Sequence, residues 1–290
     1  MLLAAASGIG FGVFQAVNVR AMRSGGANPF ASMFVQVSIA AVLLAAVTLA
    51  TGDLAEVGDA PLWALGDFAL AGLVHFLGGW SLLNLSQKRI GAARTSPLLT
   101  TTPLFGVVLA LVTVGQVPGL LALGAILLMC LGAYVVAARG GEETPHPLDA
   151  LPGLGCAFMW ALSPIFIVEG LKGFDSALAG LTVGLAVCVV ACAAVFAAGR
   201  GGVLSWQSVA GAGTGFKLLA GLLVALATWW RWAALEEVTV GAVLALSLLS
   251  VPVVLFLAPV IAGRQLERVT LGLWAGAGLV VAGALILVVA

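Results

Sequence analysis

Charged side chains are scarce in this sequence. Lysine and arginine together number 12, and aspartate and glutamate also number 12, so 8% of the 290 residues are charged and the net charge is zero. A soluble domain carries about 25% charged residues, and a nucleic-acid-binding protein needs a basic face to neutralise phosphates. A chain that is 62% hydrophobic also lacks the polarity of a disordered protein. The composition therefore predicts a polytopic helical membrane protein with no nucleic-acid partner.

Side chains that bind metals or catalyse reactions are also few. The sequence has two histidines and four cysteines. Cys130, Cys156, Cys188 and Cys192 all lie inside apolar runs, where cysteine behaves as a small hydrophobic residue. The sequence contains no zinc-protease, serine-hydrolase or P-loop signature. We therefore expect no enzyme activity, no cofactor and no metal site.

Long apolar runs fill most of the chain. A helix needs about 20 apolar residues to cross a bilayer, and charged residues, prolines and glycines mark the breaks between such runs. The predicted membrane helices are 3–22, 30–50, 62–84, 92–114, 118–138, 152–170, 177–198, 213–235, 240–262 and 270–290. The predicted fold class is all-α, with ten transmembrane helices joined mostly by short loops.

A polar stretch divides these helices into two sets of five. We expect a first five-helix repeat at 1–138, a connecting loop at 139–151 and a second repeat at 152–290. At an offset of 149 residues, the halves share residue types in the pairs Trp80 and Trp229, Pro103 and Pro252, and Gln116 and Gln265. Because five is an odd number, the second repeat enters the membrane from the opposite side. This is the inverted repeat found in many secondary transporters.

Short motifs in both halves carry a family resemblance. The second half has Ala233-Ala234-Leu235, Val240-Gly241-Ala242, Leu248-Leu249-Ser250-Val251-Pro252, Glu267, Gly276 and Gly283, and the first half has Ile90-Gly91-Ala92-Ala93, Pro103, Gln116, Gly124 and Gly132. In these motifs the chain resembles the EamA-type ten-helix transporters of the drug/metabolite transporter superfamily. The resemblance implies a solute carrier, often an exporter of amino acids, metabolites or drugs, with a central cavity between the repeats. The family usually has glutamate where this chain has Gln116, so we assign that position no ionic role.

Polar and aromatic side chains inside the predicted helices are the candidates for lining such a cavity. Polar groups are costly in a bilayer and usually face the bundle interior or water. The candidate substrate-binding residues are Gln15, Asn18, Gln36, His75, Trp80, Thr100, Thr101, Pro103, Trp160, Ser163, Trp229, Ser247, Ser250 and Pro252. Since few candidates are ionic, they favour neutral, zwitterionic or aromatic solutes.

The prolines of the fourth and ninth predicted helices occupy matching positions. Proline lacks an amide proton and frees the carbonyl four residues before it. In transporters, helices interrupted at matching positions of two repeats mark the binding site. The freed carbonyls, together with Thr100, Thr101 and Ser250, are then available to a polar solute. The alternative is that Pro103 and Pro252 only kink their helices, and that serine and threonine hydroxyls bond to the freed backbone groups.

Two titratable residues lie within the third predicted helix. His75 is a candidate proton acceptor for coupling, or else a neutral histidine bonded to a neighbouring helix. Asp67 is the second coupling candidate, or else it reaches interfacial water near the end of the helix. We place Arg231 at the membrane interface, where the adjacent tryptophans form an aromatic belt.

The predicted function is a secondary transporter in a membrane, which we expect to be the bacterial inner membrane. It exports small neutral, zwitterionic or aromatic metabolites, such as amino acids or drug-like solutes, by alternating access. Its partners are the small-molecule substrate and the lipid bilayer, and the protein is a monomer or a homodimer. The alternative is a membrane scaffold or interaction subunit that transports nothing.

The basic residues divide unequally between the two sides of the predicted membrane protein. One side has Arg20, Arg23, Lys88, Arg89, Arg94, Arg139, Arg200, Lys217, Arg264 and Arg268, and the other has Lys172 and Arg231. Cytoplasmic loops carry the excess of lysine and arginine. This rule places both termini outside, whereas the family resemblance implies that both termini are inside.

Overall fold

The computed structural model describes residues 1–23, 28–53, 57–114, 117–138, 147–197, 213–238 and 240–289. In these ranges the secondary structure is entirely helical. Eight of the helices are long and apolar enough to cross a membrane. The predicted fold class, an all-α polytopic membrane protein, is confirmed.

The helices follow the predicted order along the chain. The first half contains α1 (Leu2–Met22), α2 (Pro29–Thr51), α4 (Leu62–Gly72), the π-helix η2 (Leu73–Trp80), α5 (Ser81–Ile90), α6 (Ala92–Leu99), α7 (Thr102–Val114) and α8 (Leu120–Ala138). The second half contains α9 (Leu151–Gly173), α10 (Ala177–Ala197), α12 (Thr214–Glu237), α13 (Val240–Ser247), α14 (Ser250–Ile261) and α15 (Leu271–Val289). Short 3-10 turns lie at Val57–Asp59 (η1) and Pro147–Ala150 (η3).

The eight long spans account for all but the fourth and fifth predicted helices. The fourth, predicted at 92–114, is divided into α6 and α7, and neither piece is long enough to span a bilayer. The fifth corresponds to α8, whose apolar part Leu120–Val136 is shorter than the other spans. The count of ten spans therefore stays a prediction.

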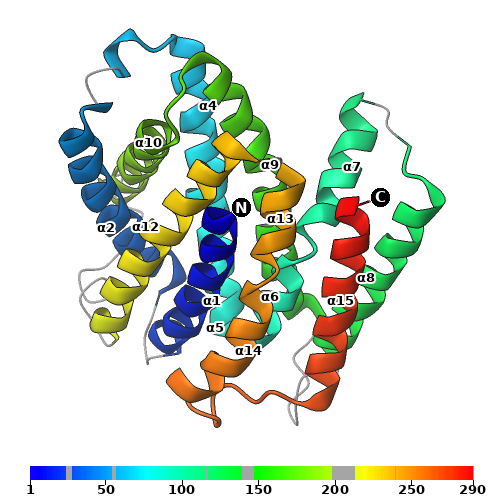
Figure 1. Ribbon diagram of the computed structural model, residues 1–290. Helices are drawn as coiled ribbons and strands as arrows, with labels where there is room; N and C mark the ends of the chain where they lie inside the picture. Colours follow the sequence, from blue (N-terminus) through cyan, green and yellow to red (C-terminus); the bar gives the residue numbers. More distant parts are fainter. Residues whose placement is uncertain are drawn as a thin grey trace.

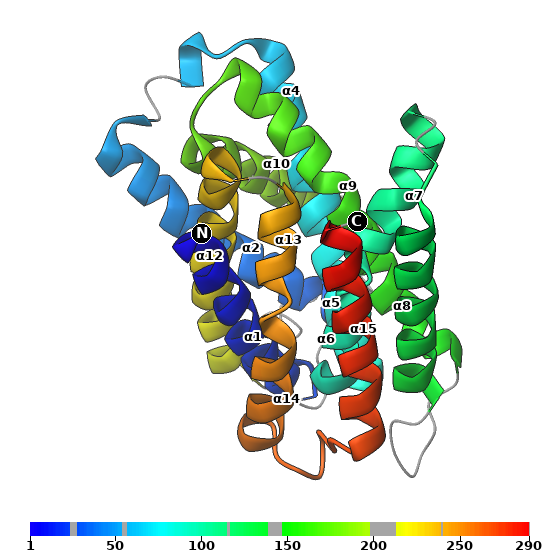
Figure 2. The same cartoon turned by 45° about the vertical axis from the view of Figure 1, so that its right-hand side comes forward.

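The two halves of the chain exchange partners in a matching way. Helix α1 packs against α12 and α14 of the second half, and α9 packs against α4 and α7 of the first half. Helices α8 and α15, the last of each half, form a closely packed pair beside this group (Figures 1 and 2). Helices α1 and α9 run in opposite directions (Figure 1). Such an arrangement is expected of an inverted repeat, and the division into two five-helix repeats stays a prediction.

Two helices are broken at corresponding places. One break, at Thr100 and Thr101, separates α6 from α7, and the other, at Leu248 and Leu249, separates α13 from α14. At both breaks the backbone tightens to bonds between residues three apart, such as Thr100 N–H to Pro97 O at 3.2 Å and Leu248 N–H to Ala245 O at 3.2 Å. Pro103 and Pro252 lie in the first turns of α7 and α14, where a missing amide proton costs no helical hydrogen bond.

Glycines allow the helix backbones to approach closely. A Cβ atom on Gly72 of α4 would overlap the backbone of Gly184 in α10. On Gly132 of α8 it would lie 2.8 Å from the carbonyl oxygen of Gly276 in α15. Small residues at such contacts are the usual basis of helix association in membranes, where packing replaces the hydrophobic effect.

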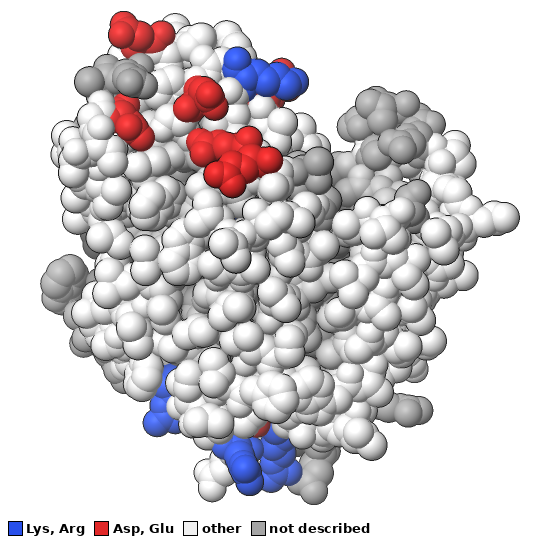
Figure 3. Space-filling model, viewed as in Figure 1, with Lys and Arg blue, Asp and Glu red and all other residues white. Residues whose placement is uncertain are grey.

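Charge is segregated along the long axis of the molecule. On the face shown in Figure 3, acidic residues gather at one end and basic residues, with few exceptions, at the other. Arg20 lies in the last turn of α1, and Lys88 and Arg89 lie in the last turn of α5. Asp53 follows α2, and Asp59 lies in η1. The two polar ends are thus separated by an apolar middle, as in a membrane-spanning protein.

We predict that the basic end faces the cytoplasm and that both termini lie outside. Alkaline phosphatase fused after Ala290 should be active, and green fluorescent protein at the same position should stay dark, because each reporter works on one side only. A fusion truncated after Ala138, at the end of α8, should show the reverse pattern. A fluorescent fusion after Ala290 would show that this orientation is wrong.

The glycine contacts predict a contrast between two positions on α4. Gly72→Ala should lower the melting temperature of the purified protein, because overpacking costs about 1–3 kcal/mol. Gly66→Ala should leave it unchanged or raise it slightly, because nothing lies within 4 Å of the added methyl group and alanine favours helix. Equal melting temperatures for the two variants would contradict the close contact between α4 and α10.

Candidate functional site

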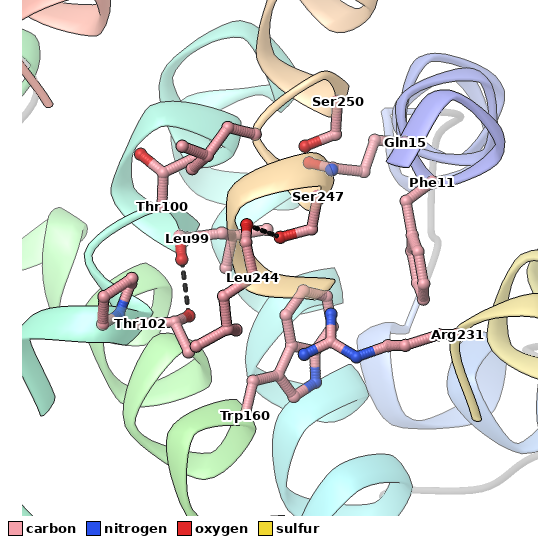
Figure 4. A pocket seen from close by; sticks show the side chains of 12 residues that line it. Phe11, Gln15, Leu99, Thr100, Thr102, Trp160, Arg231, Leu244, Ser247 and Ser250 are labelled. Carbon is pink, nitrogen blue, oxygen red and sulfur yellow. Dashed lines mark hydrogen bonds between the residues drawn. The ribbon is translucent and has the colours of Figure 1, made fainter. Parts of the chain in front are cut away.

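A pocket lies where the first helix of each half meets the two broken helices. Its lining residues are Phe11, Gln15, Leu99, Thr100, Thr102, Pro103, Trp160, Arg231, Leu244, Ser247, Leu248 and Ser250, from α1, α6, α7, α9, α12, α13, α14 and the two breaks (Figure 4). The pocket volume, counted to its open mouth, is about 450 Å³, but little of this space admits a whole water molecule. The pocket is therefore narrow in this conformation.

Hydroxyl groups bond to the backbone at both breaks. Pro103 leaves the Leu99 carbonyl without its helical donor, and the Thr102 hydroxyl donates to that carbonyl at 2.6 Å. In the other broken helix, the amide of Val251 donates to the Leu248 carbonyl at 3.1 Å. The structure therefore supports the interpretation that the chain itself satisfies the carbonyls freed by the prolines.

These backbone bonds determine what the hydroxyls offer to the pocket. The Thr100 hydroxyl donates to Pro97 O at 2.7 Å, and the Ser247 hydroxyl donates to Leu244 O at 2.6 Å. A hydroxyl that donates a hydrogen bond still has lone pairs that can accept one. Thr100, Thr102 and Ser247 therefore present hydrogen-bond acceptors to the pocket.

Arg231 lies inside the molecule, and its predicted interfacial position is wrong. The residue is 5% exposed and lines the pocket. Figure 4 shows its side chain reaching from α12 toward Trp160. Helix α12 (Thr214–Glu237) nearly coincides with the predicted helix, so the difference arises because Arg231 lies on the buried side of this helix. The neighbouring Trp232 is also fully buried and packs against Phe68 at 6.2 Å, so it forms no aromatic belt.

Aromatic rings form one wall of the pocket and the layer behind it. Phe11 and Trp160 line the pocket with their ring centroids 5.7 Å apart. The ring of His75 stacks on Trp160 at 5.4 Å, and its Nδ1 lies 2.9 Å from the Ser163 hydroxyl. His75 belongs to the π-helix η2, a type of irregularity that occurs often at functional sites. His75 and Ser163 thus lie behind the pocket wall rather than in the pocket.

Four buried amide side chains form a separate cluster. Asn18 donates to Asn84 at 2.7 Å and to Gln87 at 2.8 Å, and it accepts from Gln36 at 2.6 Å. All four residues are fully buried. Their amides bond to one another across α1, α2 and α5, so Asn18 and Gln36 hold these helices together rather than lining the pocket.

The structure places the predicted binding residues in several locations. Gln15, Thr100, Pro103, Trp160, Ser247 and Ser250 line the pocket. Trp80 is buried in the core, Trp229 packs at its edge, Pro252 is partly buried in α14, and Asp67 is partly exposed on α4. Proton coupling through His75 or Asp67 therefore stays a prediction.

Sequence reasoning missed six of the lining residues. These are Phe11, Leu99, Thr102, Arg231, Leu244 and Leu248. Phe11 lies one helical turn before Gln15 and so shares its face, which is a usable signal. Arg231 also carried a signal, because it is a cation with apolar residues on both sides. The leucines carried none, since leucine is common in every helix of this protein.

A second hollow contains the remaining predicted threonine. Counted to its open mouth, it has a volume of about 710 Å³, and it is lined by Leu98, Thr101, Leu104, Phe105, Cys130, Ala133, Tyr134, Ala150 and Leu154. Thr101 makes the same kind of backbone bond as Thr100, to Leu98 O at 2.7 Å. Adjacent threonines thus face different hollows.

Glu267 fixes the start of the broken helix α6. Its carboxylate accepts hydrogen bonds from the amides of Ala92 at 3.1 Å and Ala93 at 3.0 Å. Gly91 has a φ of +80°, which glycine adopts without strain. Burial raises the pKa of Glu267, while the amide hydrogen bonds and Arg23 oppose this shift. Gln116, to which we assigned no ionic role, lies outside the described residues.

Comparison with known proteins gives a family. Residues 1–138 match the model of the EamA-like transporter family. This part of the chain belongs to that family. The resemblance drawn from the sequence motifs is confirmed, and this family match indicates a membrane transporter of the drug/metabolite type.

The fold is also found among solved structures. A crystal structure described only as that of a protein aligns with 97% of this chain and 95% of its own, with a TM-score of 0.61 and 18% sequence identity. The two proteins therefore share a fold over nearly the whole length of this chain. No curated protein matches the sequence.

The geometry predicts opposite results for two polar residues on α1. Asn18→Leu should lower the stability by about 2 kcal/mol, because it removes three buried hydrogen bonds. Gln15→Leu should change it by less than about 0.5 kcal/mol, since the Gln15 carbonyl oxygen is buried without a hydrogen-bond partner in the described residues. Chemical or thermal unfolding in detergent measures both values. A large loss for Gln15→Leu would show that Gln15 has a structural role.

Proposed function

We propose that this EamA-type protein is a secondary transporter that exports small neutral, zwitterionic or aromatic metabolites through the central pocket. One observation carries the proposal. The pocket is lined by both broken helices and by the first helix of each half. In secondary transporters, substrate sites lie at the repeat interface and are formed by discontinuous helices.

The composition of the pocket supports this substrate class. Phe11 and Trp160 offer aromatic faces, and three hydroxyls offer acceptors to N–H or O–H groups of a solute. Aromatic surfaces with a small number of placed polar groups are typical of sites for small organic molecules. Transport changes the location of the solute and not its chemical structure, so we propose no enzymatic role.

Alternating access is the mechanism that this conformation supports. The pocket is narrow in this conformation, so loading of a metabolite requires the helices around it to separate. The breaks at Thr100–Thr101 and Leu248–Leu249 lie beside the pocket, and a few residues at element ends are the usual hinges. The half-helices are the elements that we propose to move.

Two adjacent threonines provide a matched test of this proposal. Thr100→Val and Thr101→Val each remove one hydroxyl that bonds to the backbone at 2.7 Å, but only Thr100 lines the central pocket. In proteoliposomes, Thr100→Val should reduce solute efflux about five- to tenfold, the effect of one hydrogen bond, and Thr101→Val should have little effect. Equal effects of the two variants would remove the central pocket as the transport site.

A further inference from the structure

Arg231 has an unusual environment for a cation. It is 5% exposed and lines the central pocket, and its Nε is buried with no hydrogen-bond partner in the described part of the chain. An ionised side chain inside a membrane protein is costly unless an opposite charge or strong acceptors surround it. In the described ranges of the chain, this guanidinium group therefore has no acidic partner.

The acidic residues that the structure describes are engaged elsewhere or are at least partly exposed. Glu267 caps α6, Asp149 pairs with Arg89 at 3.7 Å, and Glu169 pairs with Lys172. Glu236 accepts from the amide of Ala177 at the start of α10. Among the residues that the structure places, no aspartate or glutamate lines the pocket. A ligand must therefore supply the negative charge.

The other pocket groups indicate what the rest of this ligand looks like. The side-chain amide oxygen of Gln15 is buried and accepts no hydrogen bond from the described residues. The nearby hydroxyls of Thr100, Thr102 and Ser247 donate their hydrogen bonds to backbone carbonyls. These atoms accept hydrogen bonds but cannot neutralise an anion. Phe11 and Trp160 provide an apolar surface. The pocket thus combines one anion-binding group, several acceptors and an aromatic wall.

We infer that Arg231 binds the carboxylate of the transported solute, and that the apolar body of the solute lies against Phe11 and Trp160. The inference rests on the proposed transport function and narrows its substrate class to small carboxylates with an apolar body. The planar guanidinium matches one carboxylate through two parallel hydrogen bonds. A single cation in a narrow pocket suits a monoanion better than a phosphate dianion. Gln15 and the hydroxyl oxygens accept from any ammonium or hydroxyl group that the solute carries.

Matched pairs of probes test the charge requirement. We choose phenylacetate with phenylacetamide, and leucine with leucinamide, because each pair differs in the carboxylate alone. Binding to the native state raises the melting temperature, so at least one carboxylate should stabilise the purified protein more than its amide does. Stabilisation by leucine alone would identify amino acids, and stabilisation by phenylacetate alone would identify simple carboxylates. If neither carboxylate exceeds its amide, the inference is overturned.

Variants then assign the effect to Arg231. Arg231→Gln should weaken carboxylate binding about 10- to 100-fold, as expected for a lost charge-assisted hydrogen bond. Arg231→Lys should give an intermediate loss, because it keeps the charge but not the planar fork. The matched control is Arg264→Gln, which removes an exposed arginine in the connection between α14 and α15 and should leave binding unchanged. Unchanged binding in Arg231→Gln overturns the inference.

Stability without ligand separates a binding role from a structural one. Because Arg231 is buried and unpaired, Arg231→Met should melt at the same temperature as the wild type or at a higher one. A structural arginine would give a lower melting temperature. A lower melting temperature in Arg231→Met, together with carboxylate binding that follows the loss of folded protein, overturns the inference.

Transport distinguishes this inference from the function on which it rests. The stabilising carboxylate should exchange across proteoliposomes containing the wild type, and this exchange should be lost in Arg231→Gln. If the carboxylate binds through Arg231 but does not cross, the transport function is wrong and the site stands. If it crosses equally well in Arg231→Gln, the site is wrong and the transport function stands.

Discussion

Inside a bilayer, every backbone amide and carbonyl must find a partner within the protein. Pro103 and Pro252 have no amide proton, and each leaves one carbonyl of the preceding turn to be satisfied in another way. The Thr102 hydroxyl satisfies one of these carbonyls and the Val251 amide satisfies the other. At these replacement hydrogen bonds one helical segment ends and the next begins. Residues at the two breaks line the pocket. The architecture of the site therefore depends on how the backbone bonds around two prolines.

Polar groups elsewhere in the membrane region follow the same constraint. The amides of Asn18, Gln36, Asn84 and Gln87 bond to one another, and the charged residues shown in Figure 3 gather at the ends of the molecule. Arg231 departs from this pattern among the described residues, because its charge lies in the pocket without an acidic partner there. A group that a folded membrane protein leaves unsatisfied is a strong indication of what its ligand provides.

Several pocket residues could be predicted from sequence because their chemistry is unusual in an apolar helix. Thr100, Ser247 and Trp160 are polar or aromatic residues within hydrophobic runs. Pro103 has a matching proline, Pro252, in the second half. The same reasoning assigned Asn18 to the cavity, but in the structure Asn18 belongs to a separate cluster of buried amides. It also placed Arg231 at the interface, because composition does not show which side of a helix packs against the other helices. Residue type indicates which side chains avoid lipid, but not which of them face one another.

The sequence alone determined that this protein is an all-α membrane protein, because 8% charge cannot cover a water-facing surface. It also pointed to Pro103 and Pro252 as possible interruptions, but proline alone does not fix a break, because Pro164 lies inside the continuous helix α9. Only the tertiary structure decided which polar side chains bond to one another and which remain available to a solute. That division depends on contacts such as those of α1 with α12 and α14, which join residues more than 200 positions apart. Packing placed Arg231 in the wall of the pocket, whereas its sequence neighbours alone are also compatible with an interfacial position.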